Sequence, residues 1–274
     1  MSLTTLRNIP PWEWPPNAAE MILEILDDAD ADGADRLLAV ELAGDSTVIC
    51  DELAAALLSI IGNEREPDEL RGRAAIALGP ALEYAFIDEF EEPDEVPISE
   101  PMFNRIQEVL HRLYLEQDAP QIVRRRALEA SVRAPRDWHQ SAVRQAYARD
   151  DENWKLTAVF CMQFIRGFEK QILESLASDD PTIVFEAVCG AGNWEIDAAW
   201  PYVAALIRDE ETEKDLLLTA IEAAVLIRPH EAPGLFSPLL DSDDEDIVDA
   251  VHEALAMGDA FWDDGDDDDA PTIH

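Results

Sequence analysis

Along most of the chain, apolar residues recur at the three- and four-residue spacing that marks one face of an α-helix. In several segments a bulky apolar residue is followed four positions later by Ala or another apolar residue, and three further on by a small or apolar one. The pattern occurs at Leu70/Ala74/Ala77, Val123/Ala127/Ala130, Trp154/Ala158/Cys161, Ile183/Ala187/Gly190, Leu216/Ala220/Ala223 and Ile247/Val251/Ala254. Sustained strand-like alternation is absent, so the pattern predicts an all-α protein.

The helical pattern is periodic. From Val123 onward the first residues of successive copies are 31, 29, 33 and 31 positions apart, whereas Leu70 and Val123 are separated by 53, which indicates an insertion. Acidic breaks separate the copies and offer N-caps, and a second helix is expected after each copy, at residues 140–149, 169–177, 196–208 and 232–240. Two helices cannot bury their apolar faces alone, so neighbouring pairs are expected to stack into a solenoid.

The copies beginning at Leu70 and Val123 resemble bacterial HEAT repeats, including those of the PBS-lyase type. In such repeats the first helix carries an acidic residue, then Val-Arg, then Ala, and ends with Ala-Leu-Gly. The resemblance spans residues 17–258, and the basic residue of the motif is kept at Arg71, Arg124 and Lys155. It implies an α-α superhelix of about six to seven antiparallel helix pairs. It also implies a non-enzymatic scaffold that binds another protein on its concave face. The alternative is a HEAT-like enzyme or a bilin-lyase-type, chromophore-handling protein.

Three segments stand apart from the repeats. Residues 1–16, which contain Trp12 and Trp14 among prolines, are expected to cap the apolar end of the solenoid, with a recognition epitope as the other reading. Residues 88–101 are acidic and proline-rich and predict an inserted loop. Residues 259–274 combine like charge with few apolar groups and predict a disordered tail.

Charge and composition narrow the function classes. The chain has 60 acidic and 20 basic residues, a net charge of −40, so nucleic acid and anionic membranes are not expected partners. Two explanations of this acidity are open: a solvated surface that keeps the chain soluble, which we favour, or electrostatic attraction of a basic partner. No apolar run reaches the roughly 20 residues of a membrane span, and residues 1–16 lack a signal-peptide pattern. Three dispersed cysteines read as reduced thiols, so we expect a cytoplasmic location.

The arginines are unevenly distributed. Nine of seventeen lie between Arg105 and Arg149, a stretch with only five acidic residues. The favoured reading is that these guanidinium groups pair with carboxylates of neighbouring repeats. The functional reading is a docking site for an acidic segment, and the candidate partner-binding residues are Arg124, Arg125, Arg126, Arg133 and Arg136, together with Trp12 and Trp14.

Two patterns point toward metal chemistry. Asp28, Asp30, Asp32 and Gly33 match the first half of a calcium-binding loop, but Ala39 stands where the bidentate Glu belongs, which favours an ordinary acidic turn.

The His230-Glu231 and His252-Glu253 pairs resemble those of deoxyhypusine hydroxylase, a HEAT-repeat enzyme family that builds a di-iron site from four such pairs. Only two pairs occur here, and they stand in different contexts, a turn and a helix, so we interpret them as solvent-facing. The sequence has no nucleophile elbow, phosphate-binding glycine loop or zinc-type spacing. We therefore predict no catalytic residue, no metal and no cofactor, and a protein that is not an enzyme.

Overall fold

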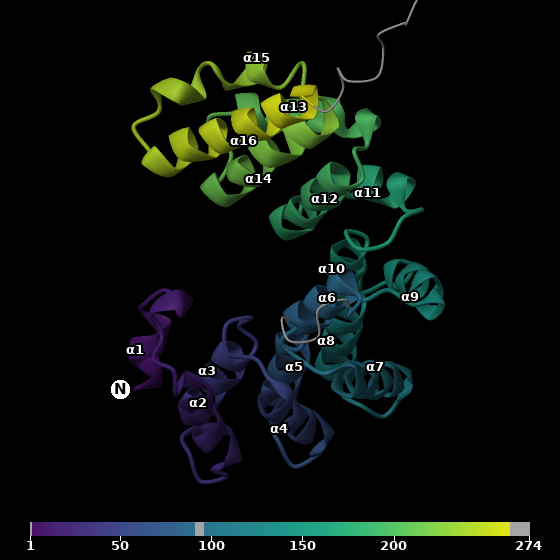
Figure 1. Ribbon diagram of the computed structural model, residues 1–274. Helices are drawn as coiled ribbons and strands as arrows, with labels where there is room; N and C mark the ends of the chain where they lie inside the picture. The colour runs from purple at the N-terminus through teal and green to yellow at the C-terminus, as the bar shows by residue number, and fades with distance from the viewer. Residues whose placement is uncertain (1, 91–95, 264–274) are drawn as a thin grey trace, which may run out of the picture. The chain divides into compact units, whose positions relative to one another are not determined.

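The computed structural model describes the backbone of residues 2–90 and 96–263 and the side chains of these ranges up to residue 258. Within these ranges every regular element is helical and none is a strand, which confirms the predicted all-α class. The chain divides into two compact units, residues 1–146 and 147–274. In each unit, helices pack in pairs as in a helical solenoid (Figure 1).

The first unit begins with α1, a 3-10 turn η1, and a series of packed pairs. The pairs are α2 with α3, α4 with α5, and α7 with α8, and the second members stack as α3 on α5 and α5 on α8 (Figure 1). The bounds are α1 (Leu3–Arg7), η1 (Pro11–Glu13), α2 (Ala18–Asp27), α3 (Gly33–Ala43), α4 (Asp51–Gly62), α5 (Asp68–Ala77), α6 (Gly79–Asp88), α7 (Glu100–Leu115), α8 (Gln121–Ser131) and α9 (Asp137–Tyr147).

The second unit repeats the arrangement. Its pairs are α11 with α12 and α13 with α14, and α10, α12, α14 and α16 stack in turn. The bounds are α10 (Glu152–Cys161), α11 (Glu169–Ser175), α12 (Pro181–Asn193), η2 (Asp197–Ala199), α13 (Trp200–Arg208), α14 (Lys214–Ile227), α15 (Pro233–Phe236), η3 (Leu239–Asp241) and α16 (Glu245–Asp263).

The pairing differs from the prediction in one respect: of its two neighbours in sequence, each of the motif-bearing helices α5, α8, α12 and α14 packs against the one before it, while the motif-bearing helices also stack on one another. The reason is the acidic break, which closes each pair as a short αα-hairpin of five residues, for example residues 63–67, 116–120 and 209–213. Carboxylates in these breaks cap the following helix, as where Asp180 Oδ1 accepts a hydrogen bond from the Thr182 N–H at 2.8 Å.

The insertion between the copies beginning at Leu70 and Val123 contains an additional helix. α6, of ten residues, packs on α8 and ends where the predicted loop at residues 88–101 begins. Asp51 at the start of α4 accepts hydrogen bonds from the Ser99 N–H at 2.8 Å and the Ser99 hydroxyl at 2.6 Å. This contact fixes the start of α7. Residues 91–95, also in the predicted loop, lie outside the described residues.

The last helix overlaps the predicted tail. The backbone of α16 continues to Asp263, so residues 259–263 of the segment predicted to be disordered are helical. Residues 264–274 lie outside the described residues.

Candidate functional site

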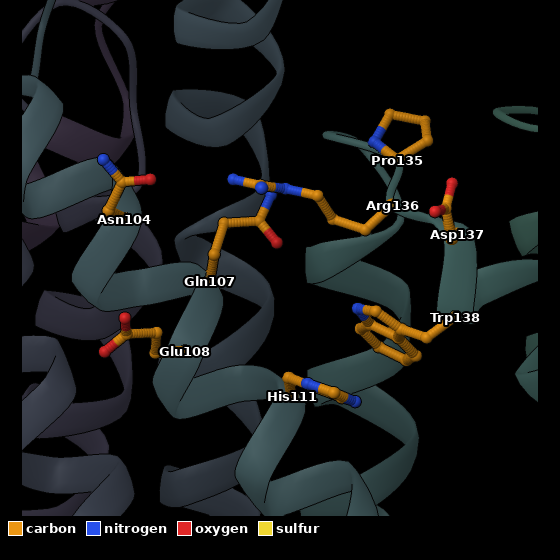
Figure 2. Close-up of a pocket in the computed structure, with 8 residues that line it drawn as sticks. All are labelled: Asn104, Gln107, Glu108, His111, Pro135, Arg136, Asp137 and Trp138. Atoms are coloured by element: carbon orange, nitrogen blue, oxygen red, sulfur yellow. The ribbon is translucent and has the colours of Figure 1, made fainter.

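A groove of about 560 Å³ lies between α7 and the turn that leads into α9. Asn104, Gln107, Glu108 and His111 form one wall, at the i, i+3, i+4 and i+7 spacing of a single helix face. The other wall consists of four consecutive residues, 135–138, in the turn and at the start of α9 (Figure 2). A continuous polar face on α7 thus lies opposite a short rigid turn.

One hydrogen bond ties the two walls together, and a second fixes the end of α7 on α8. The buried Gln107 donates its Nε2 hydrogen bond to the Ala134 carbonyl at 2.9 Å, which ties α7 to the turn before α9. The buried Arg124 donates from Nε to the Tyr114 carbonyl at 3.1 Å, which ties α8 to the last turn of α7. Each bond satisfies a backbone carbonyl near a helix end, so the bonds that shape the groove also stabilise the fold.

His139 anchors the start of α9. Its Nδ1 accepts a hydrogen bond from the Arg136 N–H at 2.9 Å, and its Nε2 lies 3.1 Å from the Ser131 hydroxyl, which donates to the Leu128 carbonyl at 3.2 Å. With Nδ1 accepting from the Arg136 N–H, the neutral ring carries its proton on Nε2; Nδ1 also lies 3.2 Å from the Arg136 carbonyl oxygen. Burial lowers the pKa of His139 to about 4; the backbone contact with Arg136 opposes this shift, and the electrostatic effects of His111 and Arg136 add to it.

An aromatic stack closes one end of the groove. The ring of Trp138 lies 4.3 Å from that of His111, centroid to centroid, and 18° from parallel, and it also stacks on Tyr114 and His139 at 5.4 and 3.7 Å. Figure 2 shows the rings of Trp138 and His111 facing each other. The half-buried His111 imidazole therefore has a fixed orientation in the groove.

The groove carries charges of both signs. Figure 2 shows the Arg136 side chain reaching from the start of α9 toward Gln107. Within the part of the chain that the structure describes, its guanidinium group forms no ion pair. Glu108 and Asp137 supply two exposed carboxylates. The groove therefore offers one guanidinium, one imidazole, two carboxylates and the exposed amide of Asn104 to a small molecule, while the buried Gln107 amide bonds the Ala134 carbonyl.

The five candidate arginines have different surroundings. Arg124 and Arg125 are buried, and Arg126 lies 2.5 Å from the carboxylate of Glu129 on the same helix. Arg133 forms an ion pair with Glu83 on α6. Arg136 alone of the five lines the groove. Of the other four, Arg133 pairs with a carboxylate on another helix, as the favoured reading expects, whereas Arg125 and Arg126 pair with Glu129 within α8, and Arg124 bonds a backbone carbonyl. Partner binding by these residues stays a prediction.

The two N-terminal tryptophans are also placed differently. Trp14 donates its indole hydrogen bond to the carbonyls of Leu6 and Ile9, at 2.9 and 3.2 Å, and packs against the core of the first unit. Trp12 is 79% exposed. α1 buries Leu3 and Leu6 and contacts α3. The arrangement supplies an anchored segment with one free indole, and whether it acts as a cap or an epitope stays a prediction.

Neither metal pattern assembles a ligand set. His230 is exposed in the turn after α14 and His252 is exposed on α16, and the described residues contain no group of three or more His, Cys, Asp or Glu side chains that could hold a metal. Asp32 instead caps α3, accepting from the Ala34 N–H at 2.9 Å. The residues therefore do not fit a di-iron centre.

Most groove residues were missed from the sequence. Arg136 was named for its charge, whereas the polar set on α7 was not singled out. The available signal was the polar i, i+3, i+4, i+7 spacing from Asn104 to His111, opposite to the apolar face of Phe103, Ile106 and Leu110. That spacing is common on solvated helix faces, so it became informative only when the turn of α9 was placed opposite.

Comparisons with known proteins give a sparse result. No family model matches the chain, and no curated protein matches it. One similar solved structure is that of human deoxyhypusine hydroxylase in complex with glycerol. The similarity has 16% sequence identity and a TM-score of 0.41, and covers 94% of this chain and 88% of that one. Among the described residues, no helix is long and apolar enough to cross a membrane.

The predicted function is corrected by this comparison. The prediction of a non-enzymatic protein-binding scaffold is wrong, because the similar structure is that of an enzyme, which fits the alternative of a HEAT-like enzyme better. At this identity the likeness concerns the fold alone, and the chemistry of the chain has to be argued from its own groove.

Proposed function

We propose that this chain is a HEAT-like enzyme whose active site is the groove between α7 and α9, where a small anionic molecule undergoes proton transfer. The observation that carries the proposal is the guanidinium of Arg136, without an ion-pair partner among the described residues, in a groove of about 560 Å³ that also holds an imidazole. A groove with several convergent polar groups is the usual form of a small-molecule site.

Arg136 supplies the binding charge. Guanidinium groups bind carboxylates and phosphates through paired N–H donors, and such charge-assisted bonds are stronger than neutral ones. Exposed arginines such as Arg105 also form no ion pair among the described residues, so what distinguishes Arg136 is its place in the groove. Asn104 lines the same groove and can hydrogen-bond the rest of the ligand.

His111 supplies the proton-transfer group. Imidazole takes up and releases a proton near neutral pH, and the stack on Trp138 holds the ring in one orientation. The imidazole accepts one proton from the substrate or from a water molecule and returns it in the later step, so His111 ends unchanged. Glu108 lies one turn earlier on the same face, so a carboxylate and an imidazole line one groove.

The experiment is a thermal-shift screen of small carboxylates and phosphate monoesters, followed by NMR detection of turnover of each ligand found. Arg136→Gln is expected to reduce affinity by at least tenfold, and His111→Gln is expected to retain binding but lose turnover. Arg105→Gln, an exposed arginine on α7 outside the groove, is the matched control. Ligands that bind equally well to Arg136→Gln would refute the assignment of the groove.

A further inference from the structure

The bond between the Arg136 N–H and His139 Nδ1 has the form of one half of a capping box. α9 begins at Asp137, so His139 is its third residue and Arg136 is the residue before the helix. In a capping box the side chain of the third residue, usually Glu or Gln, accepts a hydrogen bond from the N–H of the residue before the helix. Here a histidine ring performs that role, at 2.9 Å.

The ring is held at both ends. Nε2 faces the Ser131 hydroxyl at the end of α8, and that hydroxyl is itself fixed by the Leu128 carbonyl. The indole of Trp138 stacks on the His139 ring at 3.7 Å. One buried side chain therefore fixes the backbone of Arg136 and one face of Trp138, two of the four residues in that wall of the groove.

We propose that His139 is the positioning residue of this groove: its ring, acting through the backbone of Arg136 and the indole of Trp138, places the anion-binding guanidinium against the polar face of α7. The inference rests on the proposed function, because positioning has meaning only if the groove binds an anion.

The surroundings keep the ring neutral. The titratable and charged groups around it are His111 and Tyr114 on α7, Arg136 in the turn and the exposed Asp137, while α8 contributes the uncharged Ser131. Two of these carry or can acquire positive charge, and Nδ1 already accepts the hydrogen bond from the Arg136 N–H. The Arg136 carbonyl oxygen, 3.2 Å from Nδ1, acts in the opposite direction but is outweighed by burial of the ring. The lowered pKa of His139 agrees with this geometry.

Three variants distinguish a histidine that positions the groove residues from one that only stabilises the fold. His139→Leu removes the acceptor for the Arg136 N–H. His139→Gln restores the usual acceptor of a capping box. Ser131→Ala removes the other end of the network and leaves the Arg136 bond in place.

The experiment measures the affinity of sulfate, whose charge is constant near neutral pH, at pH 7 and constant ionic strength. Folded protein is used well below each melting temperature. We expect His139→Leu to weaken sulfate binding at least fivefold, and His139→Gln and Ser131→Ala to stay within twofold of wild type. If affinity instead follows melting temperature across the three variants, His139 is only structural and the inference is overturned.

A second measurement needs no ligand. Nitrogen-15 NMR of the full chain at pH 7 is expected to show His139 neutral, with the proton on Nε2, and the Arg136 amide resonance shifted in His139→Leu but retained in His139→Gln. A retained Arg136 amide in His139→Leu would also overturn the inference. If the wild-type chain binds no sulfate while the NMR result holds, the proposed function fails and the local geometry of His139 stands.

Discussion

His139 Nε2 lies 3.1 Å from the hydroxyl of Ser131, in a place where neither side chain is exposed. The ring is neutral in the folded chain, with a pKa of about 4 against an ordinary value of 6.5. Between these two values the unfolded chain binds a proton that the folded chain does not. Stability from this residue is therefore fully present above pH 6.5 and is lost as the pH falls toward 4.

The first prediction concerns that pH dependence. Lowering the pH from 7 to 5 is expected to reduce the free energy of unfolding through His139 by about 2 kcal/mol. Urea unfolding at both pH values measures this, and His139→Gln is expected to lack this part of the decrease. His230→Gln, at an exposed histidine, is the control. The same pH dependence in wild type and His139→Gln would contradict a neutral buried ring.

The second prediction concerns the ion pair that joins α3 to the turn before α5. Arg36 donates two hydrogen bonds to Glu66, at 2.7 and 2.8 Å, and both side chains are largely buried. The bond to Arg36 lowers the pKa of Glu66, so this stability is present above the ordinary value of 4.5 and is lost at lower pH. Glu66→Gln is expected to cost about 2 kcal/mol at pH 7.

The control for that pair is Glu69→Gln. Glu69 pairs with Arg73 at 3.0 Å, and both side chains are more than half exposed, so its loss is expected to cost less than about 0.5 kcal/mol. Denaturant unfolding of both variants gives the comparison. Equal costs would show that burial does not strengthen the Arg36–Glu66 pair.

The third prediction concerns close packing of α3 on α5. A Cβ added at Gly44 would lie 2.5 Å from the Ala77 carbonyl oxygen, so the backbones must separate to admit it. Gly44→Ala is expected to lower the free energy of unfolding by about 1 to 3 kcal/mol. Gly62→Ala, where a Cβ meets nothing within 4 Å, is the matched control and is expected to be neutral or slightly stabilising. A neutral Gly44→Ala would contradict the packing.

The fourth prediction concerns the contact that fixes the start of α7. Asp51→Ala removes both acceptors of Ser99 and is expected to cost about 1 to 2 kcal/mol. It is also expected to speed hydrogen exchange at the Ser99 amide. Glu52→Ala, at the exposed next position, is the control. An unchanged exchange rate at Ser99 would show that this amide does not depend on Asp51.

The sequence predicted the helical stack well, because each repeat carries its own period and its own cap. The motif helices from Leu70 onward are all present, and the acidic breaks form the hairpin turns. The partner was assigned wrongly for α5, α8, α12 and α14, because apolar spacing shows which face is buried but not which neighbour covers it. α6 was missed because Gly79 and Pro80 resemble a break, although Pro is favoured in a first helical turn.

The groove was hardly predictable from the sequence. Asn104 and Arg136 are 32 positions apart, and no local pattern indicates that they face the same space. In the sequence pattern His139 is one more polar residue of a helix, because its burial results from contacts with α8 and with the ring of Trp138. Of the functional candidates, only Arg136 could be named from charge alone.

The central claim is that the groove between α7 and α9 binds a small anion through Arg136. The most direct test is titration of the nitrogen-15-labelled chain with sodium sulfate at constant ionic strength, following the side-chain signals of Arg136 and the indole of Trp138. The account predicts saturable shifts at these two groups that vanish in Arg136→Gln and persist in Arg105→Gln. Shifts that survive Arg136→Gln, or that arise only elsewhere in the chain, would contradict it.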